Sequence, residues 1–269
     1  MNDPHVVALM YRIRHDGTID YSRAERLERD EPKFRLTVEK KEVRFEFKEH
    51  FSTEQQARET IGDYIRIWEF DATLKYGNPD SFRLEFVTAK IIDRNPSPDC
   101  AGVVEIFEKI HVSDSLKLTL SVSKYPSPPS DIALNPEAET MYQRYMGYLQ
   151  QREPLPGMAY FCLPILEDPP TADSKKRCSS GKRKDAAERF GIDENVLDRI
   201  GELSSTKGGT DARKWKGTNQ SLSSKEHKFL DCAVKAIIRR VAEREHAGIG
   251  NLPKLSLSDL LDDEVSAGV

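Results

Sequence analysis

The residues of this chain with the greatest chemical potential lie in two stretches rich in lysine and arginine. The first stretch contains Lys175, Lys176, Arg177, Lys182, Arg183 and Lys184, and the second contains Lys207, Arg213, Lys214 and Lys216. From residue 175 to 246 the sequence has 18 Lys and Arg against 11 Asp and Glu, a net charge of +7 in a chain whose total is −4. This local excess of positive charge favours an anionic partner, either nucleic acid or another polyanion.

Glycine and tryptophan in the second stretch fit contact with nucleic acid. Gly208 and Gly209 follow Lys207, and Trp215 stands between two lysines. Glycine lets the backbone approach a phosphate, lysine neutralises the phosphate, and an indole ring stacks on a base. The order Gly-x4-Gly-Lys-Ser/Thr of a phosphate-binding P-loop is absent. The same residues also fit a solvated loop without a partner.

Residues 185–200, between the two stretches, predict two helices joined by a turn. Small Ala187 permits close helix approach, Gly191 supplies the turn, and Ile192, Leu197 and Ile200 fill the space between the helices. This spacing resembles a helix-turn-helix, whose second helix enters the major groove of DNA. That second helix is acidic here, with Asp193, Glu194 and Asp198 against Arg199 alone. A plain helical hairpin is therefore the alternative.

Arg239 and His246 form a third candidate site, on the last long helix. At about 100° per residue they lie within roughly 20° of each other around the helix. The spacing, counted from Arg239 or Arg240, resembles the Arg-x4-6-His element of HEPN-type ribonucleases. The resemblance implies an arginine that holds the scissile phosphate and a histidine that transfers protons, usually across a homodimer. The alternative is an ordinary solvated helix end.

Cysteine and histidine spacing does not suggest a metal site. The cysteines are Cys100, Cys162, Cys178 and Cys232, without a Cys-x-x-Cys pair, and the six histidines lack close ligand spacing. We therefore expect no metal and no cofactor, and free thiols in a reducing cytoplasm. Apolar runs are shorter than the about 20 residues of a membrane helix, so we expect no membrane contact. The first 15 residues do not resemble a signal peptide.

The elements that position these residues change type near residue 130. Up to that point, apolar residues alternate with polar ones in segments 34–38, 43–47, 82–86 and 116–122 and form short apolar runs over 6–13 and 103–112, which predicts strands. Residues 16–31 are polar and predict a loop or a short helix. Ser52 and Gln55 form a capping-box pattern before a predicted helix over 53–75. A mostly antiparallel sheet with one long packed helix follows from this order.

After a proline-rich connector over 125–130, the apolar period becomes helical. Asn135-Pro136 predicts a helix start, and further helices are expected over 158–166, 182–189 and 194–203. Ser223 and Glu226 form a second capping box before the clearest amphipathic helix. The fold prediction is therefore α+β, with a sheet module over 1–130, a helical module with basic loops over 131–248, and an acidic tail over 249–269 that is either mobile or docked as a peptide.

Three other segments bear a resemblance to a bacterial protein family of unknown function. They are Ile67-Trp-Glu69 with Ile91-Ile-Asp-Arg-Asn-Pro96, Arg152–Phe161, and Asn195–Gly209 continuing into Ala212-Arg-Lys214. The resemblance runs from about residue 60 to 245. It implies that both modules recur together, and it implies no activity.

Three functional hypotheses follow. The first is a non-enzymatic cytoplasmic binding protein whose ten basic residues, named above, contact nucleic acid or another anionic partner. The second is a HEPN-like, metal-independent ribonuclease that uses Arg239 and His246, with a homodimer as its expected form. The third is an interaction scaffold that binds another protein, its acidic tail masking the basic loops.

Overall fold

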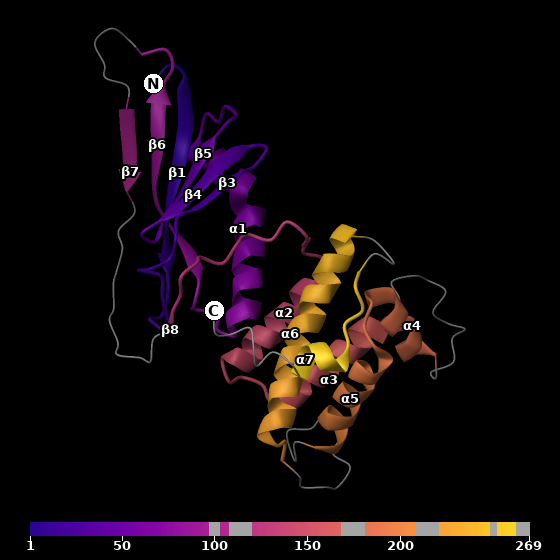
Figure 1. Ribbon diagram of the computed structural model, residues 1–269. Coiled ribbons are helices and arrows are strands. Elements are labelled where there is room, and N and C mark those ends of the chain that lie inside the picture. Colours follow the sequence, from indigo (N-terminus) through magenta and orange to yellow (C-terminus); the bar gives the residue numbers. More distant parts are fainter. Residues whose placement is uncertain (97–102, 108–119, 168–180, 208–220, 248–251, 262–269) are drawn as a thin grey trace. The chain divides into compact units, whose positions relative to one another are not determined.

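The chain forms two compact units, which divide between Pro129 and Ser130. The structure is a computed structural model that describes residues 1–96, 103–107, 120–167, 181–207, 221–247 and 252–261 (Figure 1). The first unit contains a sheet and one long helix, and the second is helical. The predicted α+β class is confirmed. No helix in these ranges combines the length and apolar character that a membrane crossing needs.

The first unit is built on an antiparallel sheet with the strand order β3-β4-β5-β1-β6-β7 (Figure 1). Its strands are β1 (Pro4–Arg14), β3 (Leu27–Asp30), β4 (Phe34–Glu39), β5 (Glu42–Phe47), β6 (Arg83–Asp93) and β7 (Val103–Phe107). Two further short strands, β2 (Ile19–Asp20) and β8 (Leu120–Ser121), pair in parallel. The long central strand β1 lies between β5 and β6, so the sheet is assembled around it.

The expectation of a loop or short helix over residues 16–31 was wrong, because this stretch contains β2 and β3. Strand β3 is polar, with Glu28, Arg29 and Asp30 exposed. It forms at the sheet edge because β4 offers it a ladder of backbone hydrogen bonds, from the Leu27–Val38 pair to the Asp30–Arg35 pair. Pairing with a distant strand here overrides a weak local preference.

Helix α1 (Glu54–Tyr76) covers one face of the sheet. It begins one residue later than the capping pattern suggested: the side chain of Thr53, not Ser52, accepts from the backbone N–H of Gln56. It ends one residue beyond the predicted range, at Tyr76, and is capped by Gly77, whose φ of 62° is left-handed and whose N–H donates to the carbonyl of Thr73.

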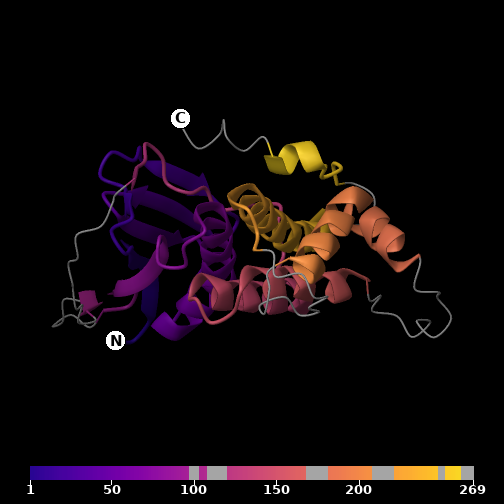
Figure 2. The same ribbon diagram turned by 90° about the horizontal axis from the view of Figure 1, so that it is seen from below.

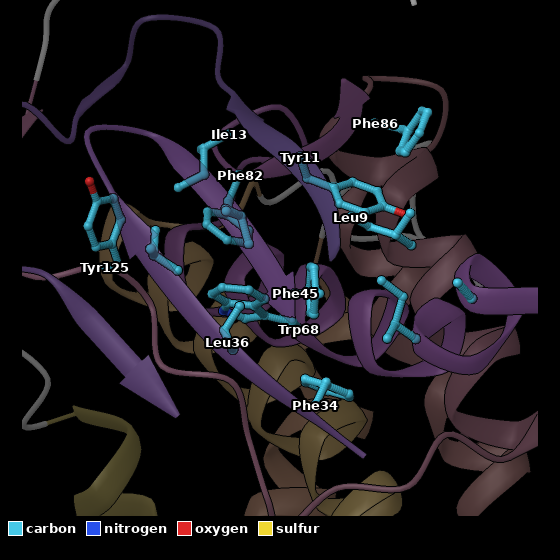
Figure 3. Close-up of a cluster of buried hydrophobic side chains, with 14 of the residues drawn as sticks. Leu9, Tyr11, Ile13, Phe34, Leu36, Phe45, Trp68, Phe82, Phe86 and Tyr125 are labelled. Atoms are coloured by element: carbon cyan, nitrogen blue, oxygen red, sulfur yellow. The ribbon is translucent and has the colours of Figure 1, made fainter. Parts of the chain in front are cut away.

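The core of the first unit is aromatic and lies between α1 and the sheet (Figure 3). Trp68 of α1 is fully buried, and its ring centroid is 4.9 Å from that of Phe82. Its indole N–H donates to the carbonyl of Pro126 at 2.9 Å. Tyr125 is also buried and stacks on Tyr21. The proline-rich connector is thus packed into the first unit.

The second unit consists of α2 (Pro136–Leu149), α3 (Leu155–Glu167), α4 (Lys182–Phe190), α5 (Glu194–Thr206), α6 (Ser224–Ala247) and the short α7 (Leu257–Leu261). Helix α3 is the most apolar and packs against α2, α4, α5 and α6. It continues through Pro164 to Glu167. Asn135 caps α2 as predicted, and Ser223 and Glu226 form the predicted capping box of α6.

Part of the predicted acidic tail is packed on the second unit rather than mobile. Residues 249–251 and 262–269 lie outside the described residues. Leu255, in contrast, forms backbone hydrogen bonds with the turn between α4 and α5, and Leu260 of α7 is only 4 % exposed. Figure 2 shows α7, in yellow, at the surface of the helices. The described portion of this segment therefore belongs to the folded unit.

The turn between β4 and β5 gives a test of the fold. Lys40 and Lys41 have φ of 51° and 68°, a conformation that costs a side-chain-bearing residue about 1 kcal/mol. Such two-residue hairpin turns favour Asn-Gly. We expect the double change Lys40→Asn, Lys41→Gly to raise the free energy of unfolding by about 1 kcal/mol, measured by urea denaturation.

Lys33 is the control for this prediction, because it is an exposed lysine outside the set of positive-φ residues. Lys33→Gly should lower the free energy of unfolding by about 0.5 kcal/mol through the entropy that glycine loses on folding. Two changes of the same sign would show that turn strain is not the cause.

Candidate anion-binding loops and their supporting ion pairs

The structure describes four of the ten basic residues predicted to bind an anion. Lys182, Arg183 and Lys184 lie in the first turn of α4, and Lys207 follows the last residue of α5. The other six lie outside the described residues: Lys175, Lys176, Arg177, Arg213, Lys214 and Lys216. The described geometry therefore concerns the residues that flank two predicted loops. We call these the first basic loop (168–181) and the second basic loop (208–222).

Arg183 joins the two ends of the first basic loop. Its Nε lies 2.9 Å from Oε1 of Glu167, the last residue of α3. Its Nη1 lies 2.9 Å from Oδ1 of Asp198 on α5. Burial works to lower the pKa of Arg183, but the bonds to Asp198 and Glu167 outweigh it and raise the pKa. A charged Arg183 thus fastens α3, the start of α4 and α5 to one another.

Glu226 does the same for the second basic loop. Its Oε1 accepts from Nζ of Lys207 at 2.6 Å and from Nη2 of Arg199 at 3.3 Å. Its Oε2 accepts from the backbone N–H and the hydroxyl of Ser223. The bond from Lys207, and then those from Ser223, lower the pKa of Glu226 to about 2. The end of α5 is thereby held to the start of α6.

Both sets of ion pairs include a residue of α5, because Asp198 and Arg199 are consecutive residues of that helix. Asp198 pairs with Arg183 beside the first basic loop, and Arg199 pairs with Glu226 beside the second basic loop. We call these six residues the base network: Glu167, Arg183, Asp198, Arg199, Glu226 and Lys207. It ties four helices together beside the described residues that flank the two basic loops.

Helices α4 and α5 are joined by three residues, as the sequence predicted for a hairpin. Gly191 has φ of 60°, and Ala187, Ile192, Leu197 and Ile200 are buried between the helices. The exposed side chains of this hairpin include Glu188, Glu194, Asp198 and Glu202. This surface is acidic and repels phosphates, so the geometry gives no support to α5 as a helix that reads DNA.

Arg239, proposed as a phosphate-binding residue, is engaged by carboxylates. Its Nη2 lies 3.1 Å from Oδ2 of Asp131, and its Nε lies 2.9 Å from Oε1 of Glu243. The adjacent Arg240 is only 8 % exposed and donates to the carbonyl of Pro253. His246 is exposed and is the penultimate residue of α6. This arrangement is a charge-paired helix face rather than an open phosphate site.

Thiols and metal-binding groups give no second candidate within the described residues. No cluster of three His, Cys, Asp or Glu side chains that could hold a metal occurs there. Cys162 is fully buried, and burial raises the pKa of its thiol to about 12. Cys232 is half-buried, and Cys100 and Cys178 fall outside the described ranges.

Sequence reasoning did not find the acidic half of the base network. Asp198 was counted only as a charge that opposes DNA binding, and Glu226 only as a capping residue. Glu167 carried no signal except its place at the end of an apolar segment. Asp198, Glu167 and Glu226 each meet a basic residue that is distant in the sequence, at separations of 15, 16 and 19 residues respectively.

No protein-family model matches this chain, and no curated protein or solved structure is significantly similar to it. The site is therefore interpreted from its own geometry.

The charge of Glu226 can be removed without removing its cap. In Glu226→Gln, the side-chain oxygen still accepts from Ser223, but the attraction to Lys207 and Arg199 is lost. We expect the free energy of unfolding at neutral pH to fall by about 1–2 kcal/mol. Because the pKa of Glu226 is lowered from 4.5 to about 2, its stabilisation is complete above 4.5 and disappears as the pH falls towards 2.

Urea denaturation followed by helical circular dichroism measures this effect, and the two proteins should converge in stability below the pKa of Glu226. The control is Glu188→Gln, which changes an exposed carboxylate on α4 and should alter stability by less than about 0.5 kcal/mol. Equal effects of the two changes would mean that the base network contributes no stability.

Proposed function

We propose that the protein is a non-enzymatic binding protein that contacts nucleic acid through its two basic loops. The base network is the observation that carries this proposal. It joins described residues that flank both loops to the same helix, through the consecutive residues Asp198 and Arg199. The residues that flank the two loops thus share one support, which favours the action of both loops on one partner.

The pattern of ion pairs supports two different roles for the basic residues of this region. The described cations of the base network, Arg183, Lys207 and Arg199, are paired with carboxylates. They hold the loops rather than contact the partner. In the sequence, Lys175, Lys176 and Arg177 precede the hairpin, and Arg213, Lys214 and Lys216 follow it. Phosphate contacts therefore fall to these six residues and to Lys182 and Lys184, which are not part of the base network, while Trp215 supplies a ring for base stacking.

This proposal differs from groove reading by a helix-turn-helix and from ribonuclease chemistry. The exposed carboxylates of α5 oppose the first. The carboxylate partners of Arg239 oppose the second, because a guanidinium already paired with Asp131 and Glu243 must lose them before it can hold a phosphate. We also propose a cytoplasmic location, which the spacing of the cysteines supports. A protein partner for the sheet unit and a homodimer stay predictions.

Salt dependence tests the loops directly. We expect the chain to bind labelled single-stranded RNA or DNA with an affinity that falls steeply as salt rises. The triple variants Lys175→Gln/Lys176→Gln/Arg177→Gln and Arg213→Gln/Lys214→Gln/Lys216→Gln each remove three cations. Each should reduce the slope of log affinity against log salt by about 2, because binding releases fewer counterions when fewer phosphate contacts form. Fluorescence anisotropy at several salt concentrations measures the slope.

A charge-matched control separates local contact from net charge. The triple variant Lys33→Gln/Lys90→Gln/Lys124→Gln also removes three cations, all exposed and all in the sheet unit. It should leave the slope within about 0.5 of the unmodified chain. A slope that falls equally in all three variants, or binding that is weak and independent of salt, would contradict the proposal.

A further inference from the structure

Residues 252–261 meet the turn between α4 and α5 through their backbone. The N–H of Leu255 donates to the carbonyl of Gly191 at 2.8 Å, and the N–H of Asp193 donates to the carbonyl of Leu255 at 2.8 Å. Ile192 and Leu255 thereby form a parallel bridge. This is the way in which an extended peptide adds to exposed backbone groups of a folded protein. The turn supplies one donor and one acceptor, two residues apart.

Two charged side chains complete this contact. Nζ of Lys254 lies 3.2 Å from Oδ2 of Asp193, at the start of α5. Nη1 of Arg240 on α6 donates to the carbonyl of Pro253 at 2.8 Å. Arg240 is only 8 % exposed and is held by Glu243 on the same helix. A largely buried guanidinium is thus directed at a main-chain carbonyl, a group that every peptide carries.

Gly191 is required at this place for two reasons. Its φ of 60° forms the turn, and its bare Cα lets the segment approach. A Cβ at this position would lie 3.3 Å from the carbonyl oxygen of Leu252 and 3.4 Å from the Leu252 Cβ. The segment therefore packs directly on the backbone of the turn.

The far end of the segment is anchored by helix α7. The hydroxyl and backbone N–H of Ser256 both donate to Oδ2 of Asp259, which closes the first turn of α7. Leu260 is then buried, where α7 packs on α6 (Figure 2). The contact thus requires three features of a ligand. These are a basic residue, a following residue whose backbone N–H and carbonyl form hydrogen bonds with the turn, and an apolar side chain five residues further on.

We propose that the α4–α5 turn and α6 form a peptide-binding site, and that residues 252–260 occupy it as a tethered ligand. The site takes an extended peptide that continues into one helical turn. The proposal is independent of the basic loops. The peptide contacts the turn of the α4–α5 hairpin, whereas the residues that flank the loops lie at the start of α4 and the end of α5. A tethered ligand has a high effective concentration, so an added peptide competes poorly with the intact segment and well once that segment is weakened.

The test uses the full chain and a fluorescent peptide of residues 252–261. In the chain variant Leu255→Pro/Leu260→Asp, the segment lacks the N–H for Gly191 and the apolar anchor. We expect the peptide to bind this variant at least about 10-fold more tightly than the unmodified chain. The same peptide with Leu255→Pro should not bind. Adding Asp193→Asn to the chain variant keeps the cap of α5 but removes the partner of Lys254, and should weaken binding.

Hydrogen exchange of the unmodified chain provides a second measurement that does not depend on the folding of a variant. Residues 252–260 should exchange faster than the buried residues of α6, because a tethered ligand leaves its site without unfolding of the whole unit. Exchange of residues 252–260 that occurs only when the whole unit unfolds would overturn the proposal. So would equal binding of the two peptides, or equal affinity of the peptide for the two folded chains.

Discussion

Charge pairing across α5 is the constraint on which the arrangement of the helical unit depends. Apolar contacts with α3 bring α4, α5 and α6 together, but hydrophobic contact is non-directional and permits small shifts between helices. The bonds from Arg183 to Glu167 and Asp198, and from Arg199 and Lys207 to Glu226, are directional. Loss of one partner would leave a partly buried charge without compensation, which is costly. The helices are therefore held at the positions at which all these charges are paired.

The boundary between the two units is narrower than the proline-rich composition of residues 125–130 suggests, because most of these residues belong to the first unit. Prolines 126, 128 and 129 are typical of a stiff linker, and the sequence favoured a connector over 125–130. In the structure, Tyr125 is buried and the carbonyl of Pro126 accepts from Trp68. Arg29 also donates to the hydroxyl of Ser127. The first unit thus fixes most of the connector, and the division falls after Pro129.

Much of the fold could be predicted from the sequence, because strong periodicity and capping are local signals. The β4–β5 hairpin, α1 and the capping box at Ser223 follow from residues close in the chain. Strand β3 could not be predicted, since its partner β4 rather than its own polar residues makes it a strand. The base network was missed for a related reason: Asp198 is an ordinary exposed carboxylate in the sequence, and only folding brings it to Arg183. The basic residues of the loops stay a prediction.

The acidic residues of α5 have a structural role that is separate from the role predicted for the basic loops. If the loops bind a polyanion, carboxylates at Glu194, Asp198 and Glu202 keep it away from the helix and direct it to the loop cations. Two of the same carboxylates also form ion pairs, Asp198 with Arg183 and Glu202 with Arg199. At the start of α5, Asp193 caps the helix and pairs with Lys254. The negative charge of this helix therefore follows from its supporting role, and the sign of its surface is not evidence about the loops that it holds.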